Sequence, residues 1–204
     1  MKPICFLLAL LLTQAAAQPA TPLQYGGKTY KTAKIGTQTW LAENLNYEAE
    51  GSVCYENNPA NCAKYGRLYN WSTAMKVCPK GWHLPSNAEW DKLFRFVDGD
   101  TSSVSPYNSK TAGKHLKAKS GWNENNDGKN GNGTDKYGFS ALPGGYGGLG
   151  DYFQLVGDFG FWWSASEGEG SNTAYLCGMT FFNEDAGWAN YNKSRLFSVR
   201  CVQD

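Results

Sequence analysis

A chain of 204 residues is long enough to bury a hydrophobic core and short enough to form one domain. Its 19 basic and 18 acidic residues are nearly balanced, which excludes proteins that bind nucleic acid or an anionic membrane through a strongly basic surface. The content of 24 Gly, 12 Tyr and 8 Trp residues favours short strands and long loops over long helices.

Residues 1–17 have the three parts of a signal peptide. Lys2 supplies the positive charge, residues 6–12 are apolar, and residues 15–17 are the small alanines at which a signal peptidase cuts. The apolar run is too short to span a bilayer, and no later stretch approaches the required length. The sequence therefore predicts a protein without a transmembrane segment that is secreted or held at the cell envelope, in the periplasm or on the outer surface.

Residues 18–24 form a short polar leader, and residues 25–204 show one composition throughout, which predicts a single α+β domain. A strand over 30–35, a turn and a second strand through Trp40 predict an opening hairpin. After a loop at 46–64, Ser72 is placed to cap a short helix over 73–77.

The segment 78–90, CPKGWHLPSNAEW, predicts a short buried strand followed at once by a helix. Ser86 and Glu89 have the spacing of a capping box, and apolar residues then recur at helical spacing over 87–97. His83 lies within the strand and is predicted to be buried and hydrogen-bonded rather than catalytic.

The second half of the chain predicts a weaker helix over 110–118 and a long irregular segment over 121–150, where Asn and Gly are abundant. Aromatic residues then alternate with small or polar ones, which predicts a final antiparallel meander. Its four strands are predicted at residues 159–166, 173–182, 187–193 and 196–202.

Five cysteines remain after removal of the signal peptide, so one is left over when the others pair. Cys54 and Cys62 suit a bridge within one loop, and Cys78 and Cys201 would join the segment 78–90 to the last strand. Several other pairings remain open on spacing alone. We predict these two bridges, with Cys177 unpaired, and no zinc site, because the spacings match none.

The order of these motifs resembles the Fibrobacter succinogenes major paralogous domain family from about residue 25 to residue 202. The resemblance is carried by KIGTQTWLAENLNY (34–47), CAKYGRLYNWSTA (62–74), CPKGWHLPSNAEWDKL (78–93), GTDKYGFSALPGGY (133–146), FWWSAS (161–166) and SVRCV (198–202). It implies a variant of the C-type lectin-like fold, with two main helices packed on a small twisted antiparallel sheet and long loops between them. Members of the family are often found at the cell envelope.

The loop 123–135 is the candidate metal site, because it concentrates the oxygen ligands that calcium prefers. Asn123, Asn125 and Asp127 have the spacing of an EF-hand loop, but Thr134 stands where a glutamate is needed. An EF-hand is therefore not predicted. A lectin-style calcium held by Asp127 and Asp135 remains an alternative to a polar loop without an ion.

Carbohydrate binding requires aromatic faces that stack on sugar rings, together with amides or carboxylates that bond to hydroxyl groups. Both kinds of side chain occur near the last strands. The candidate residues are Trp162, Trp163, Asn183, Glu184, Asp185, Trp188, Asn190, Tyr191 and Asn192. Adjacent residues of a strand face opposite ways, so half or more of these aromatic residues belong to the core.

These observations predict a non-catalytic domain that recognises an extracellular or envelope ligand, either a glycan or a protein. A structural surface protein without a ligand site is the alternative. Formylglycine-generating oxidases look similar in fold and suggest an enzyme, but they need a reactive cysteine pair and four cysteines are here assigned to bridges. We predict no catalytic residues, since no Ser–His–acid arrangement or phosphate-binding loop is evident.

Overall fold

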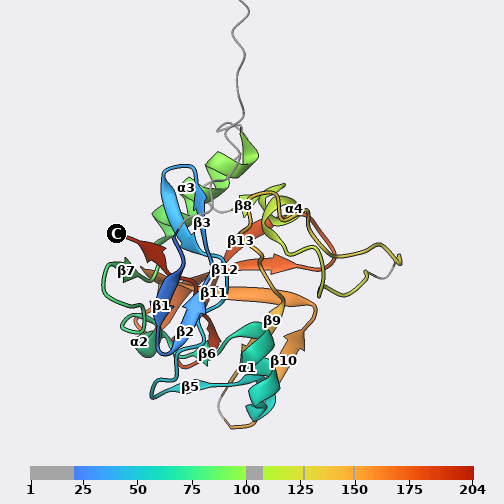
Figure 1. The fold of residues 1–204 in the computed structure, drawn as a ribbon. Helices are drawn as coiled ribbons and strands as arrows, with labels where there is room; N and C mark the ends of the chain where they lie inside the picture. The colour runs from blue at the N-terminus through green and yellow to red at the C-terminus, as the bar shows by residue number, and fades with distance from the viewer. Residues whose placement is uncertain (1–20, 100–107, 126, 149) are drawn as a thin grey trace, which may run out of the picture.

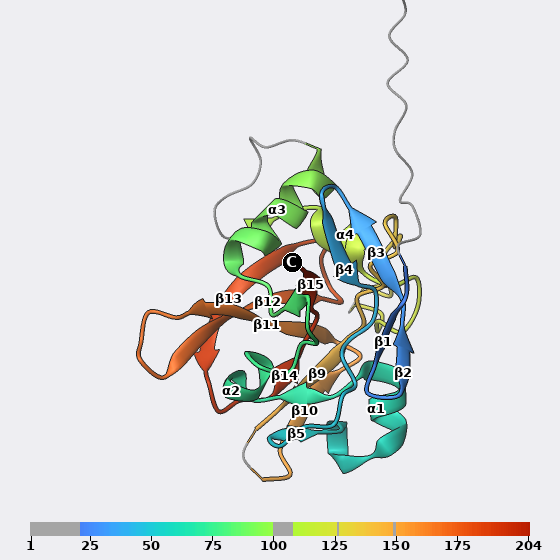
Figure 2. The same cartoon turned by 60° about the vertical axis from the view of Figure 1, so that its left-hand side comes forward.

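The computed structural model describes residues 21–99, 108–125, 127–148 and 150–204. The predicted signal peptide and the first residues of the predicted leader lie outside these ranges. The described chain forms many short strands connected by loops, and one longer helix, α3 (Asn87–Asp98), lies at the outside of the sheets (Figures 1 and 2). Within the described ranges, no helix has the length and apolar character needed to cross a membrane.

The largest sheet has nine strands. Its centre is an antiparallel meander of β11 (Phe159–Glu167), β12 (Thr173–Thr180) and β13 (Ala186–Asn192). On the other side of β11, β14 (Phe197–Ser198) runs parallel to it, so the sheet is mixed. The remaining strands of the sheet are β5 (Ser52–Val53), β6 (Leu68–Tyr69), β8 (Asn108–Ser109), β9 (Gly144–Gly147) and β10 (Phe153–Val156).

A smaller sheet joins the beginning of the domain to its end. In it, β15 (Val202–Gln203) pairs with both β4 (Gln38–Leu41) and β7 (Trp82–His83), which places Val202 beside Trp40 and His83. A separate hairpin of two strands precedes it along the chain. The four strands of the smaller sheet are β3 (Thr32–Ile35), β4 (Gln38–Leu41), β7 (Trp82–His83) and β15 (Val202–Gln203), and the hairpin consists of β1 (Leu23–Tyr25) and β2 (Lys28–Tyr30).

The main helix, α3 (Asn87–Asp98), begins where the sequence predicts. The Ser86 side chain accepts from the amide of Glu89, and the Glu89 carboxylate accepts from the amide of Ser86, which confirms the capping box. Gly99 ends the helix in the left-handed conformation. The other helical segments are the 3₁₀ turn η1 (Tyr55–Asn57) and the helices α1 (Pro59–Tyr65), α2 (Trp71–Ala74) and α4 (Ala112–Leu116).

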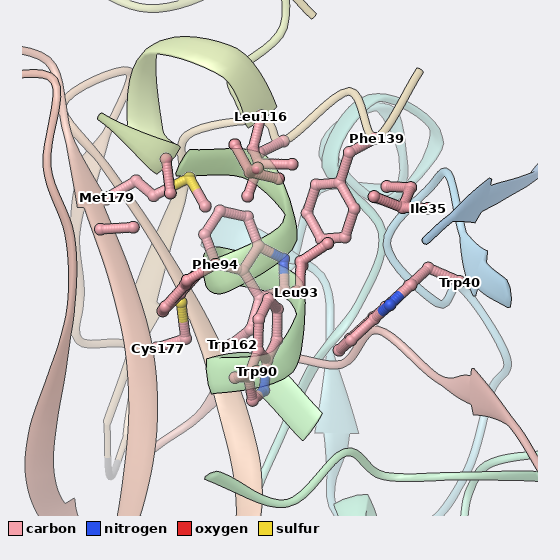
Figure 3. Close-up of a cluster of buried hydrophobic side chains, with 14 of the residues drawn as sticks. Ile35, Trp40, Trp90, Leu93, Phe94, Leu116, Phe139, Trp162, Cys177 and Met179 are labelled. Atoms are coloured by element: carbon pink, nitrogen blue, oxygen red, sulfur yellow. The ribbon is translucent and has the colours of Figure 1, made fainter. Parts of the chain in front are cut away.

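The helix α3 covers one face of the large sheet through a cluster of aromatic side chains (Figure 3). The ring of Trp90 lies 4.7 Å from that of Trp40, 6.0 Å from that of Phe139 and 6.4 Å from that of Trp162. All four residues are fully buried. Trp90 therefore fills the space between the large sheet and the smaller sheet.

A second buried cluster lies on the opposite face of the central strands. Trp163 is fully buried there, and its ring packs edge-on against Phe197 of β14 at 4.7 Å. Leu176 and Val199 belong to the same cluster. The neighbouring residues Trp162 and Trp163 thus serve two separate cores, one on each face of β11.

A buried polar network joins segments that are far apart in the sequence. The guanidinium of Arg200 is fully buried and donates to the side-chain oxygen of Asn44 at 2.8 Å and to the carbonyl of Phe139. The indole of Trp162 donates to the same oxygen of Asn44 at 2.8 Å, and the Asn44 amide donates to the carbonyl of Tyr65. Burial lowers the pKa of Arg200 to about 9, so the group remains charged at neutral pH.

The prediction of an α+β, C-type lectin-like fold, with two main helices on a small twisted antiparallel sheet, is wrong. The described residues form fifteen strands and four short α-helices, and only α3 among these helices exceeds seven residues. Six of the strands contain two residues each, too few to leave a periodic pattern in the sequence. The extent of the sheets was therefore underestimated.

Four element predictions also need correction. The helix predicted over 73–77 is α2, which spans Trp71–Ala74 and is capped by Asn70 rather than Ser72. The helix predicted over 110–118 is the single turn α4, because Gly113 packs against the backbone of Asp185 and the chain becomes extended at Lys117. The segment 121–150 is not irregular throughout, since β9 lies within it. The fourth predicted strand, at residues 196–202, does not continue the antiparallel meander. This segment instead supplies β14 to the large sheet, parallel to β11, and β15 begins at its end in the smaller sheet.

Both predicted disulfides are present. Cys54 pairs with Cys62 across a separation of 8 residues, and Cys78 pairs with Cys201 across a separation of 123. Cys177 is unpaired and fully buried. The longer bridge fixes the segment 78–90 to the last strands of the domain.

His83 is hydrogen-bonded as predicted, but the prediction that it is buried is wrong, because its side chain is 41% exposed. Its Nε2 lies 2.6 Å from Glu89 Oε1, and its Nδ1 lies 2.6 Å from Asp204 Oδ1. Partial burial lowers the pKa of His83, but the hydrogen bonds and charges of the two carboxylates outweigh it, so the pKa is raised. Burial likewise opposes ionisation of Glu89, yet hydrogen bonds from Ser86 and His83 lower its pKa.

We expect Asn44→Ala to destabilise the fold by about 3–5 kcal/mol, because the substitution leaves the donors of Arg200 and Trp162 without their shared acceptor in a dry interior. Unfolding by urea, followed by Trp fluorescence, measures the loss. Asn46→Ala is the control in the same segment, since the Asn46 side chain makes no hydrogen bond with the described residues. Equal losses in the two variants would contradict a central role for Asn44.

Removal of the long bridge, by Cys78→Ala with Cys201→Ala, is expected to cost about 5 kcal/mol in the chain-entropy model, against about 2.5 kcal/mol for Cys54→Ala with Cys62→Ala. The difference follows from the separations of 123 and 8 residues. Unfolding of both double variants under non-reducing conditions provides the comparison. A larger loss from the short bridge would show that the entropy of the closed loop does not decide the ranking.

The imidazolium of His83 stabilises the folded state, because its pKa is raised there. This contribution is complete below the unfolded pKa of about 6.5 and is lost as the pH rises through the folded pKa. His83→Gln should therefore lower the thermal midpoint at pH 6 by about 2–4 °C at most, the range expected for an exposed ion pair in a chain of this size, and by less at pH 8.5.

His115→Gln is the control for this pH dependence. His115 is the other histidine, and burial together with the nearby Lys136 and Lys114 lowers its pKa. Because a lowered pKa means that protonation of His115 destabilises the fold, His115→Gln should show the opposite trend, with a thermal midpoint that is higher relative to the parent protein at pH 6 than at pH 8.5. A His83→Gln deficit that grows with pH would refute the ion-pair assignment.

Candidate functional site

The two adjacent tryptophans that the sequence suggested for ligand binding lie in the core. Trp162 and Trp163 are fully buried, and their indole nitrogens donate to Asn44 and to the carbonyl of Tyr69, each at 2.8 Å. A side chain without exposed surface cannot contact a ligand. Both residues therefore belong to the packing of the sheet, as the alternation along β11 requires for at least one of them.

Trp188 lies at the edge of the core rather than at an open surface. It is half-buried, its ring lies 5.9 Å from that of Phe94, and its indole donates to the carboxylate of Asp91 at 3.2 Å. Burial raises the pKa of Asp91, and the hydrogen bond from Trp188 partly offsets this effect. Trp188 therefore ties β13 to α3.

The acidic candidates lie in the turn between β12 and β13, where they hold the turn in place. The Asn183 side chain accepts from Thr180 at 2.8 Å and from the amide of Asp185 at 3.2 Å, and Glu184 pairs with Lys114 at 2.9 Å. These contacts hold Asn183, Glu184 and Asp185 in the turn, and none of them involves a predicted aromatic residue.

A buried lysine closes the interior side of this turn. The amine of Lys117 donates to the carbonyls of Thr180 and Asn183 at 2.8 and 2.9 Å, and it lies over the ring of Trp122. Burial lowers the pKa of Lys117 to about 8. The adjacent pocket has a volume of only about 130 Å³, too small for a sugar ring and its substituents.

The residues predicted to bind calcium form separate local contacts. Asn125 accepts from the amides of Asp127 and Lys129, Asn123 donates to Asp158, and both carboxylate oxygens of Asp135 accept from Ser140. Within the described ranges, no group of three or more His, Cys, Asp or Glu side chains is arranged to hold a metal ion. These contacts fit the polar-loop alternative, in which Asn and Asp stabilise turns.

The remaining candidates, Asn190, Tyr191 and Asn192, are exposed at the end of β13. Tyr191 is 42% exposed, and its ring lies 5.5 Å from that of Phe197. Asn192 accepts from the amide of Ser194 at 2.9 Å, which leaves its own amide group to donate. This end of β13 therefore combines an open aromatic face with a free donor.

Next to Asn192 lies an open hollow of about 590 Å³, lined by Tyr152, Asn192, Ser194 and Arg195. Tyr152 is 42% exposed. Its ring lies 6.1 Å from that of Tyr146, which in turn lies 5.8 Å from that of Phe197. Tyr152 thus lines the hollow beside polar donors, Tyr146 contacts Tyr152, and Tyr191 is linked to Tyr146 through Phe197. We call the set Tyr146, Tyr152, Tyr191, Asn192, Ser194 and Arg195 the tyrosine surface.

The glycine-rich strand β9 explains how this surface forms. The backbone of Gly147 exchanges two hydrogen bonds with Leu196, at 2.9 and 3.0 Å, which brings the chain after β13 against β9. A Cβ atom at Gly148 would lie 2.7 Å from Nη1 of Arg195 and 3.1 Å from the ring of Tyr152. The absence of a side chain at this position makes room for both groups (β9 and β10 are labelled in Figure 1).

Hydrogen bonds hold the hydroxyl of Tyr146 in place at this surface. The hydroxyl of Tyr146 donates to Gln154 at 3.0 Å and lies 3.4 Å from the hydroxyl of Tyr152. The contact with Tyr152, together with burial, raises the pKa of Tyr146 to about 12. The surface therefore presents phenol groups and one cation, Arg195, at neutral pH.

Sequence reasoning did not find Tyr146, Tyr152, Ser194 or Arg195. The glycines around Tyr146 fall in the segment 121–150 that was predicted to be irregular, and Ser194 and Arg195 fall between two predicted strands. A local signal existed, because glycines on both sides of a tyrosine indicate close approach of another backbone. The partner of that approach is not readable from one sequence.

A second hollow, of about 690 Å³, lies between β1 and α2. The rings of Tyr25 and Tyr47 stack on each other there at 4.4 Å. Asn70 caps α2, Thr73 donates to the carbonyl of Glu50, and the Tyr25 hydroxyl donates to a backbone carbonyl. Because these groups already serve the fold, this hollow is a weaker candidate than the tyrosine surface.

The unpaired cysteine is not placed for chemistry. Cys177 is fully buried in the cluster around Trp90, and burial raises the pKa of its thiol well above the ordinary value. A reactive cysteine needs access and a lowered pKa. Cys177 therefore acts as a small apolar side chain of the core.

Comparison with known proteins gives one match. The model of the Fibrobacter succinogenes major domain family matches residues 33–203. Searches of curated proteins and of solved structures returned no match. The matched region includes all strands from β4 onward and the whole tyrosine surface. Since it spans most of the sequence, the chain belongs to the Fibrobacter succinogenes major domain family.

Proposed function

We propose that this protein is an exported, non-catalytic binding domain that recognises a carbohydrate outside the cell or at its envelope through the tyrosine surface. The observation that carries the proposal is the exposure of Tyr152 and Tyr191, each at 42%, beside a hollow lined with polar groups. Exposed aromatic rings that lie close to hydrogen-bond donors suit a ligand with both apolar faces and hydroxyl groups.

The rigidity of the surface supports the same proposal. Tyr146 and Tyr191 both contact Phe197, which is fixed between them by its packing on Trp163. A surface whose side chains are already held in position loses little conformational entropy when a ligand binds. Two disulfides, expected to persist outside the cell, stabilise the domain beneath it.

A protein ligand is the second candidate, and a different patch favours it. Phe182 is 53% exposed, and its ring contacts those of Phe159 at 6.0 Å and Phe181 at 5.4 Å. A patch of adjacent phenylalanines without donors suits an apolar protein surface better than a sugar. The patch involves β11 and the turn after β12, and none of its three phenylalanines lines the hollow.

Binding to a glycan array and to polysaccharides in affinity electrophoresis tests the proposed function. We expect Tyr152→Ala combined with Tyr191→Ala to weaken carbohydrate binding about tenfold or more, because two stacking faces are lost. Thermal unfolding should change little, since both side chains are exposed.

Phe182→Ala is the control, because it removes an aromatic ring that is at least as exposed as those tyrosines, from the other patch. Carbohydrate affinity should survive this substitution. Absence of binding to any glycan, with capture of a protein that Phe182→Ala abolishes, would favour the protein ligand instead. Absence of both would leave the structural role as the better explanation.

A further inference from the structure

Arg195 is held in place at the hollow by packing. Its guanidinium carbon lies 5.8 Å from the ring centre of Tyr146 and 5.5 Å from that of Tyr152. Gly148 gives it room, because a Cβ atom there would lie 2.7 Å from Nη1. The contacts with two ring faces are cation–π interactions, which position the cation without using its N–H donors.

The charge of Arg195 is not neutralised by the described residues. None of these residues forms a hydrogen bond or an ion pair with its guanidinium. Lys193, two residues earlier, does pair with a carboxylate, that of Glu167. The carboxylate nearest in sequence to Tyr152, that of Asp151, accepts from Asn57 at 2.7 Å. Arg195 is also the one charged group among the described residues that line the hollow.

These features define the chemistry of the ligand. A guanidinium with free donors matches a carboxylate through two parallel hydrogen bonds. Neutral phenol groups beside it do not repel an anion, and their faces suit the apolar face of a sugar ring. The Asn192 amide and the Ser194 hydroxyl remain available for sugar hydroxyls, so the hollow combines the groups that recognise an acidic sugar.

We propose that the hollow binds an acidic sugar, a uronic acid unit within a polysaccharide, and that Arg195 binds its carboxylate. The inference rests on the proposed carbohydrate-binding function and adds the class of sugar. An acidic peptide also offers carboxylates, but its flexible Asp and Glu side chains have no ring face that would stack on the two tyrosines beside Arg195. The arrangement around Arg195 therefore favours the sugar.

Isothermal titration with oligogalacturonate and with its methyl ester tests the inference, because esterification removes the charge of each carboxyl group at the cost of one added methyl group. The parent protein should bind the acid form at least about tenfold more tightly. Arg195→Gln should remove this preference and leave the affinity for the ester nearly unchanged. Arg195→Lys should retain part of it, since a lysine keeps the charge but not the planar pair of donors.

Two further variants separate position from charge. Gly148→Ala keeps every charged group but displaces the guanidinium, and it should also reduce the preference for the acid form. Lys34→Gln removes one charge from an exposed position on β3 and should leave the preference intact. Thermal midpoints within a few degrees of the parent protein verify that each variant is folded.

Three outcomes would overturn the inference, and they have different meanings. Equal affinity for acid and ester, both weakened by Tyr152→Ala, refutes the acidic sugar but keeps the carbohydrate site. Absence of binding to both probes, and to every glycan on an array, refutes the proposed function as well. Binding of poly-L-glutamate in preference to oligogalacturonate, with the same dependence on Arg195, assigns the site to a protein ligand.

Discussion

The buried contact between Arg200 and Asn44 is the interaction on which the rest of the domain depends. Burial of a guanidinium is costly unless its donors find acceptors, and here Nη1 and Nη2 of Arg200 bond to acceptors from distant parts of the chain, whereas its Nε has no partner among the described residues. Asn44 is separated from Arg200 by 156 residues and from Trp162 by 118. The network therefore forms only when the first strands, the central strand and the last segment have all come together.

The same network explains why the motifs that identify the family belong together. Asn44, Tyr65, Phe139, Trp162 and Arg200 lie in five of the six sequence motifs that carry the resemblance. Each contributes one group to the network or a carbonyl that accepts from it. These motifs thus specify one buried junction, and five of the six residues of the tyrosine surface lie outside all of them.

The sequence allowed some features to be predicted because their causes are local. The capping box depends on Ser86 and Glu89, which are three residues apart. The hairpin of β3 and β4 depends on the short turn between these two strands. The sheets could not be predicted, because strands such as β14 and β15 contain two residues and exist only through distant partners. For the same reason Arg195 was missed, since only the pairing of Leu196 with Gly147 brings it to the hollow.

The site prediction favoured tryptophan, whereas the structure exposes tyrosine. All eight tryptophans are buried or half-buried, and Tyr152 and Tyr191 are the most exposed tyrosines near the hollow. A tryptophan gains more by burial because its apolar area is larger, so a small domain with many sheet faces uses it for packing. A tyrosine keeps its hydroxyl in water while one face stays open. The tyrosine surface therefore presents exposed tyrosines, whereas the tryptophans pack inside the domain or at the edge of its core.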